Sequence, residues 1–245
     1  MAATYVSTVL LNPDSGPGSS QLQLFSDITQ QSQAAGMKVL GYVDSAYGDR
    51  ALEDVLNDID TYSQWYQVDG FFIDDMYIAG KQMYSLTDCS ECCCCWPAHV
   101  SRPADETKVQ YYQEIYNGVK NSSLYSDESV DDTQLIFNPG APEVPEAYMP
   151  FADIFLTFEG SAASYTNFQA ADYTDDYDAS KFWHVVYSCD SNATINATLE
   201  QFTNQRAEYL YITDLGLPNP YGNLPSIETW AQLLAYMGDI VSSTS

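Results

Sequence analysis

The sequence predicts an α/β protein with a (β/α)8 TIM-type barrel. Strand and helix signals alternate along the chain, and the strands are continuous apolar runs. Apolar strands alternating with helices form a parallel sheet that helices cover. A doubly wound open sheet is the competing architecture, and it requires a glycine-rich phosphate loop after an early strand. The loop at residues 12–18 contains Pro13 and Pro17, which lack the amide donors of such a loop, so the barrel is favoured.

Seven strands are expected, at residues 5–11, 37–43, 70–74, 135–138, 154–158, 182–187 and 209–213. Helical spacing of apolar residues predicts helices at 21–35, 51–66, 105–120, 195–206 and 226–240, the first ending at Gly36. Because the chain ends on a helix that follows a strand, we expect the first strand of the barrel to be lacking, upstream of Tyr5. No shift in composition marks a boundary, so residues 1–245 are expected to form one domain, with an atypical Cys-rich loop at about 80–104.

The composition limits the partners of this chain. Eight Lys and Arg against 34 Asp and Glu give a formal net charge of −26, which repels phosphate backbones and excludes nucleic acid. The same charge attracts a polysaccharide that bears free amines, or simply keeps an exported protein soluble. No run of 18 apolar residues exists, so no membrane span is expected. Glycosylation sequons at Asn121, Asn192 and Asn196 favour an extracellular or cell-surface location, although no signal peptide is visible in this chain.

Acidic residues close two of the predicted strands. Asp74 and Asp75 follow the apolar run Phe71-Phe72-Ile73, and Glu159 follows residues 154–158. In a barrel the carboxyl ends of all strands lie on the face that carries catalytic residues. Two carboxyl groups on either side of a scissile bond are the requirement of glycoside hydrolysis. Asp74, Asp75 and Glu159 are therefore the candidate catalytic residues, although a regular strand cannot point both Asp74 and Asp75 inward.

Further polar and aromatic residues lie at the same strand ends and are candidates for binding substrate. They are Asn12, Tyr42, Asp44, Asn138, Tyr187 and Asp214. The aromatic members offer flat faces on which sugar rings stack. Asp and Asn also start turns and cap helices in any α/β protein, so a purely structural role is the alternative for each residue taken singly.

Other catalytic chemistries have little support in the sequence. His99 and His184 are the only histidines, and neither a Gly-x-Ser-x-Gly nor a His-Glu-x-x-His motif is present. We therefore expect no serine triad, no catalytic metal and no cofactor.

Five cysteines, Cys89 and Cys92 to Cys95, crowd the loop at about 80–104, and Cys189 follows a distant strand. One loop cysteine paired with Cys189 is compatible with an oxidising compartment. A thiolate metal site is a second interpretation, although the spacing is unusual for one. A translated intron, which would make the loop foreign to the fold, is the third.

An ordered set of short motifs resembles the spherulin 4-like family over nearly the whole chain. The motifs are Leu11-Asn12-Pro13-Asp14-Ser15-Gly16-Pro17-Gly18, Val39-Leu40-Gly41-Tyr42-Val43, Val68-Asp69-Gly70-Phe71-Phe72-Ile73-Asp74-Asp75, Phe137-Asn138-Pro139-Gly140 and Thr157-Phe158-Glu159. The resemblance implies a (β/α)8 barrel. In fungal members it also implies a secreted or cell-surface glycoside hydrolase that cleaves galactosaminogalactan, an α-1,4-linked polymer of galactose and N-acetylgalactosamine with some free amines.

The resemblance carries over the acids Asp74, Asp75 and Glu159. The chain departs from the family at Asp75, where the family has Glu, and in lacking the first strand. The expected function is a monomeric, endo-acting hydrolase of an amino-sugar polysaccharide, with Glu159, on its apolar strand, as the proton donor. The alternative is a non-catalytic glycan-binding wall or spore-coat protein.

Overall fold

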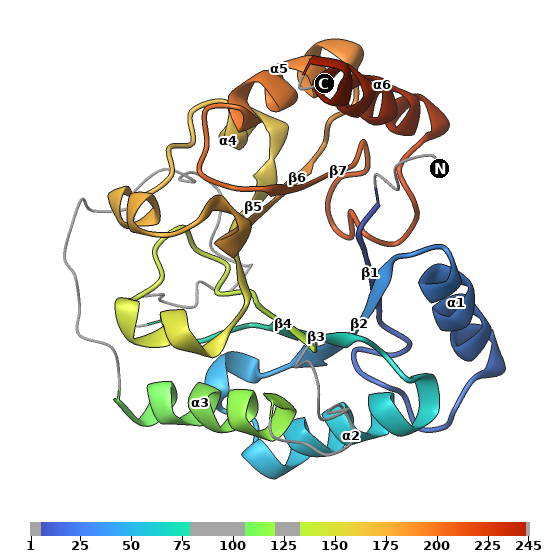
Figure 1. Ribbon diagram of the computed structural model, residues 1–245, viewed down its shortest axis with the longest axis vertical. Coiled ribbons are helices and arrows are strands. Elements are labelled where there is room, and N and C mark those ends of the chain that lie inside the picture. The colour runs from blue at the N-terminus through green and yellow to red at the C-terminus, as the bar shows by residue number, and fades with distance from the viewer. Residues whose placement is uncertain (1–5, 79–105, 121–132, 244–245) are drawn as a thin grey trace.

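The computed structural model describes residues 6–78, 106–120 and 133–243 and confirms the α/β fold class. Seven parallel strands form one sheet in chain order, from β1 to β7. The strands are β1 (Thr8–Leu11), β2 (Lys38–Asp44), β3 (Gly70–Asp74), β4 (Gln134–Phe137), β5 (Ile154–Ser161), β6 (Phe182–Tyr187) and β7 (Tyr209–Ile212). Figure 1 shows them following one another around an arc, a curled half-barrel. No strand pairing joins β7 to β1 within the described residues. The Cys-rich loop at 80–104 lies outside those residues.

Helices cover the outside of the arc. The α-helices are α1 (Gln23–Ala34), α2 (Leu52–Tyr66), α3 (Glu106–Lys120), α4 (Ala162–Tyr165), α5 (Asn192–Phe202) and α6 (Ile227–Ser243). Figure 1 places α1, α2 and α3 outside the first half of the sheet and α4, α5 and α6 outside the second half. The sequence did not predict α4 or the short 3-10 helices η1 (Ala46–Gly48), η2 (Glu146–Phe151), η3 (Asp172–Asp176) and η4 (Ala179–Lys181). None of the helices described is long and apolar enough to cross a membrane.

Side-chain alternation along the strands divides the core into an outer and an inner layer. On β3, Phe71 packs outward against the helices, whereas Phe72 packs inside the arc. The inner layer also contains Leu40, Ile136 and Leu156, all buried. The inner face of the sheet is therefore closed by packed apolar side chains. Side chains that point to the same face nearer the carboxyl ends of the strands lie above this apolar layer.

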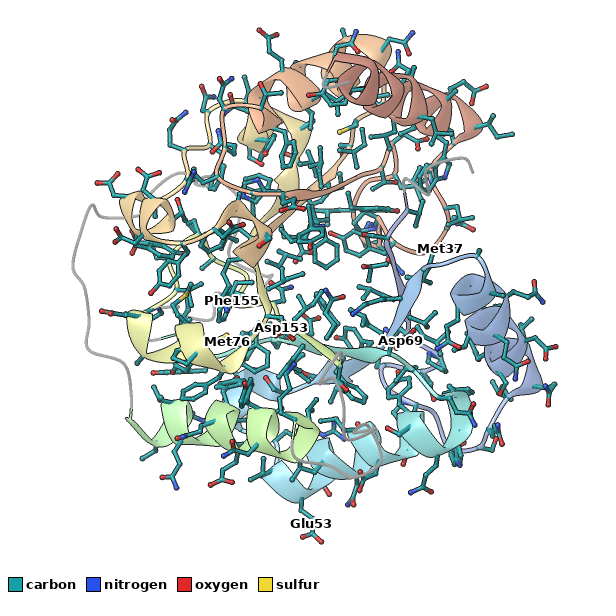
Figure 2. The ribbon with its side chains drawn as sticks, in the orientation of Figure 1. Met37, Glu53, Asp69, Met76, Asp153 and Phe155 are labelled. Carbon is teal, nitrogen blue, oxygen red and sulfur yellow. The ribbon has the colours of Figure 1, made fainter. Side chains whose placement is uncertain are left out.

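Two acidic residues at the opposite, amino-terminal ends of the strands form hydrogen bonds with neighbouring strands (Figure 2). Asp69, just before β3, accepts the N–H of Val39 at 2.7 Å. Asp153, just before β5, accepts the N–H of Leu135 at 2.7 Å and pairs with Lys120 at 3.2 Å. These carboxylates satisfy backbone donors of neighbouring strands, so the acids at this end of the sheet have a structural role.

Close contact between β3 and β4 leaves no room for a side chain at Gly70. A Cβ atom there would lie 2.0 Å from the carbonyl oxygen of Gln134. We expect Gly70→Ala to lower the free energy of unfolding by about 2–3 kcal/mol, because the strands must separate to admit the methyl group. The control is Gly36→Ala, where nothing lies within 4 Å of the added Cβ and only the positive φ of +86° opposes it, for about 1 kcal/mol. Equal midpoints of the two variants in urea would contradict the steric account.

Candidate active site

The two adjacent acids of β3 lie on either side of a break in the strand. Asp74 is the last residue of β3, and Asp75 adopts a left-handed backbone with φ of 50°. Regular alternation therefore ends at Asp74, and Asp75 does not simply point to the opposite face of the sheet. Ser45 Oγ holds this turn, because it lies 2.9 Å from the carbonyl oxygens of both acids. Tyr112 on α3 supports Ser45 through a hydroxyl–hydroxyl contact of 2.9 Å.

A bulge in β5 sets the direction of Glu159. The register between β5 and β6 shifts between Leu156 and Phe158, so Thr157 is an extra residue in β5. Leu156 belongs to the inner layer, whereas Phe158 packs on the outer side of the sheet near β6. Without the extra residue, Glu159 would continue the outward parity of Phe155. The bulge instead places Glu159 on the inner face, opposite Val185 of the inner layer.

Asn138 joins the two acids. Its Nδ2 donates to Asp74 Oδ1 at 2.8 Å and to Glu159 Oε2 at 3.0 Å, which leaves these two carboxylate oxygens less than about 6 Å apart. The orientation of the amide is fixed because its Oδ1 accepts the N–H of Gly140 at 2.8 Å. Asn138 is buried, so both of its amide hydrogens are committed to the acids.

Each of the three acids also contacts a tyrosine hydroxyl. Tyr42 donates to Asp74 Oδ2 at 2.7 Å, and Tyr221 donates to Glu159 Oε1 at 2.6 Å. The hydrogen bond between Tyr47 and Asp75 is one of the causes that raise the pKa of the Tyr47 phenol, after burial. Tyr47, like Asp75, has a left-handed backbone, with φ of 56°. Tyr42, a predicted substrate-binding residue, lies beside the acids, whereas nothing in the periodicity of the sequence pointed to Tyr221, which lies 62 residues from Glu159.

Asp74 and Glu159 differ in how deeply they are buried. The pKa of Asp74 is raised, chiefly by burial and further by the charges of Asp75 and Glu159, against the lowering effect of the Tyr42 hydrogen bond. Glu159 is exposed. The expectation that Glu159 is the proton donor rested on enclosure by an apolar strand, and this enclosure is absent. Asp74 is the acid whose surroundings favour the protonated form.

The remaining predicted binding residues divide into two groups. Asp44 is the register partner of Asp74, and Tyr187 is close enough to Tyr221 to add to the effects of burial and Glu159 on the pKa of that phenol. Both therefore lie near the acids. Asn12 instead accepts the N–H of Gly16 at 3.1 Å and shapes its own loop.

Asp214 accepts the N–H of Ser226 at 2.8 Å, just before α6. It ties the two ends of the loop between β7 and α6 together. This contact is the structural role that turn-forming residues commonly have, and it stands beside the substrate-binding role predicted for Asp214.

His184 and Cys189 lie behind the sheet. Tyr165 OH contacts His184 Nδ1 at 2.8 Å, and burial lowers the pKa of His184 to about 3, so the imidazole is neutral. Cys189 Sγ contacts the hydroxyl of Thr198 at 3.7 Å. No disulfide and no metal-holding group of three or more His, Cys, Asp or Glu side chains occurs within the described residues. The cysteines that could pair with Cys189 or form a thiolate site lie outside those residues.

A cavity of about 460 Å³ lies away from the acids. Residues of η2 and the segment just before β6 line it, among them Met149, Tyr177 and Lys181. These residues precede β5 and β6, so the cavity belongs to the amino-terminal end of the sheet. Lys181 donates to the carbonyl oxygen of Ala152 there. The convergent carboxylates, rather than this cavity, mark the candidate active site.

The fold and the site together define a class of protein, a curled α/β half-barrel with carboxylates gathered at the carboxyl ends of its strands. Comparison with known proteins is more specific. Residues 2–237 match the spherulation-specific family 4, so the chain belongs to this family. Its resemblance to the spherulin 4-like family, carried by the motifs from residue 11 to residue 159, is thereby confirmed.

Two relatives illustrate the relationship. Spherulin-4 of Physarum polycephalum is 28% identical over 160 residues, which cover 64% of this chain but only 38% of that protein. The crystal structure of Aspergillus clavatus Sph3 in complex with GalNAc matches with a TM-score of 0.68 and 24% identity. That match covers 93% of this chain and 85% of Sph3, and it shows that the two share a fold.

Proposed function

We propose that this protein is a glycoside hydrolase that cleaves an α-1,4-linked polysaccharide containing N-acetylgalactosamine or galactosamine. The observation that carries the proposal is the single amide of Asn138, which bridges one oxygen of Asp74 and one oxygen of Glu159. Retaining glycosidases hold their two carboxyl groups roughly 5–5.5 Å apart, and inverting ones about 6.5–9.5 Å apart. The separation of less than about 6 Å supports a retaining mechanism.

The environments of the acids support a different role for each. Asp74, whose pKa burial raises, protonates the glycosidic oxygen as the bond to the leaving sugar breaks. Glu159 attacks the anomeric carbon and forms a covalent glycosyl ester. Asp74, now ionised, accepts a proton from water, and this water attacks the same carbon and releases Glu159. The charge of Asp75 favours the protonated state of Asp74 before the first step.

The anomeric form of the first product tests this mechanism. Because two successive displacements at one carbon restore its configuration, an α-linked substrate is expected to release the α-anomer first. Proton NMR of the reaction with α-1,4-linked N-acetylgalactosamine oligosaccharides, recorded before mutarotation, distinguishes the two outcomes. The β-anomer as first product would contradict the nucleophilic role of Glu159 and leave it as a base for water.

The relatives and the charge of the chain support the proposed glycan. The shared fold with a protein crystallised with GalNAc supports an amino-sugar substrate. A formal net charge of −26 favours a chain that bears free amines. Asn192 and Asn196 are exposed on α5, as glycosylation at the predicted extracellular or cell-surface location requires. We further propose that the protein acts as a monomer and cleaves within the polymer.

A non-catalytic glycan-binding wall or spore-coat protein is the second candidate. It is favoured by Asp75, which is one methylene shorter than the Glu of the family and is held by Tyr47. Galactosaminogalactan separates the two functions. A hydrolase converts it to shorter oligosaccharides over hours, whereas a binding protein pulls it down unchanged. Mass spectrometry of the soluble products decides between them.

A further inference from the structure

The contact between Tyr221 and Glu159 is made by a loop that contributes no other residue to the site. Tyr221 lies between β7 and α6, and its hydroxyl donates to Glu159 Oε1 at 2.6 Å. Its ring is tilted against that of Tyr211 at a centroid distance of 6.4 Å. The residue is 46% exposed although its hydroxyl is engaged, so the ring presents a face to solvent beside Glu159.

The loop that carries Tyr221 is fixed at its base and near its tip. The N–H of Ser226 donates to Asp214 Oδ1 at 2.8 Å, which closes the two ends on each other. The N–H of Ser188 donates to the carbonyl oxygen of Leu215 at 2.8 Å and ties the loop to the end of β6. Next to the tip, Asn219 Oδ1 accepts the N–H of Tyr221 at 3.0 Å. Three hydrogen bonds therefore hold the backbone that aims the phenol at Glu159.

Glu159 is consequently held at both oxygens by neutral donors. Asn138 donates to Oε2 and Tyr221 to Oε1, so the carboxylate cannot rotate about its last bond without losing both contacts. A hydrogen bond to an ionised carboxylate is roughly twice as strong as one between neutral groups. An exposed glutamate would otherwise sample several orientations, and covalent catalysis depends on one.

We propose that Tyr221 is a positioning residue that holds Glu159 in the orientation for attack on the anomeric carbon, and this proposal rests on the proposed function. Because Oε2 accepts from the same Asn138 amide that donates to Asp74, the carboxylate of Glu159 stays close to the proton donor. The exposed ring of Tyr221 lies beside Glu159, so the phenol restricts both the nucleophile and the sugar that approaches it. The loop between β7 and α6 thus belongs to the active site, although none of its residues reacts.

Kinetics of Tyr221→Phe test the proposal, with Tyr209→Phe as the matched control. Tyr209 lies at the amino-terminal end of β7 and packs with the inner layer. We expect Tyr221→Phe to lower kcat by about 10- to 100-fold with little change in KM. The variant keeps the aromatic ring and loses only the hydrogen bond that orients the Glu159 carboxylate. A pH profile in which the acidic limb also moves to higher pH supports the role. Kinetics of Tyr221→Phe equal to those of Tyr209→Phe would overturn it.

A measurement without substrate keeps this test separate from the proposed function. Burial, the charge of Glu159 and the hydrogen bond to it raise the pKa of the Tyr221 phenol. In protein labelled with carbon-13 at tyrosine Cζ, with the signal assigned by its loss in Tyr221→Phe, this phenol is expected to ionise at lower pH in Glu159→Gln than in the wild type. An unchanged titration would overturn the Tyr221–Glu159 contact. A shifted titration in a chain that hydrolyses no glycan would refute the proposed function and retain the contact.

Discussion

Replacing Glu159 by glutamine is expected to reduce hydrolysis of the polysaccharide by about 10³-fold or more while the fold is retained. The side chain is exposed, and the amide keeps its size and one acceptor oxygen, so packing is unaffected. The reaction loses the carboxylate that forms the glycosyl ester, and an amide oxygen is a poor nucleophile. Release of reducing ends from galactosaminogalactan, measured alongside circular dichroism, gives the result.

A matched control for this variant is Glu53→Gln. Figure 2 shows Glu53 pointing away from the molecule on the outer side of α2, and the residue is exposed. The same chemical change is expected to leave hydrolysis at the wild-type rate there. A glycoside with a phenolate leaving group sharpens the test, because a good leaving group does not replace a missing nucleophile. Glu159→Gln should therefore stay inactive on it. Full activity of Glu159→Gln on either substrate would contradict the assignment of Glu159 as the nucleophile.

Most of the fold was readable from local sequence patterns. The apolar runs that end at Asp74 and Tyr187 became β3 and β6 with the predicted bounds, and the helices at 51–66 and 105–120 shifted by a residue at most. Strands and helices of this kind depend on side-chain spacing, which the sequence contains. The segment between β5 and β6 was missed because its short 3-10 helices have no apolar period.

The site was harder to predict from the sequence than the fold, because its geometry depends on irregular backbone within and after the strands. Regular alternation would turn Glu159 outward, and only the extra residue Thr157 in the β5–β6 pairing turns it in. The left-handed backbone at Asp75 likewise cannot be read from an apolar run. Asp214 could not be assigned from the sequence, since an aspartate at a strand end has the same signature whether it binds sugar or closes a loop. Tyr221 reaches Glu159 through tertiary structure alone.

Replacing Asp74 by asparagine is expected to lower hydrolysis of the natural glycan by about 10²- to 10⁴-fold, the usual contribution of general acid catalysis. The variant keeps a side chain of the same shape between Tyr42 and Asn138. In contrast to Glu159→Gln, it is expected to recover activity on a glycoside with a phenolate leaving group, because that group departs without a proton. Equal losses on both substrates would contradict the role of Asp74 as the acid.

The raised pKa of Asp74 adds a pH dependence with a definite sign. Hydrolysis requires the protonated acid, so the rate falls as pH rises through the pKa of Asp74. Asp75→Asn removes one of the charges that raise this pKa, so the basic limb of its rate profile is expected to move to lower pH. A basic limb unchanged in Asp75→Asn would show that another group sets it.

Stability follows the same ionisation. A carboxyl group whose pKa is raised on folding stabilises the protein fully below its unfolded pKa of 3.8, and this contribution is lost as pH rises through the folded value. The raised pKa of Asp74 therefore opposes folding at neutral pH, and Asp74→Asn, which does not ionise, is expected to melt at a higher temperature than the wild type at pH 7. The difference should vanish near pH 3.5, where the wild-type carboxyl is protonated too. A variant less stable than the wild type at pH 7 would mean that the hydrogen bonds of Asp74 outweigh the cost of burying its charge, and the acid role would lose its physical basis.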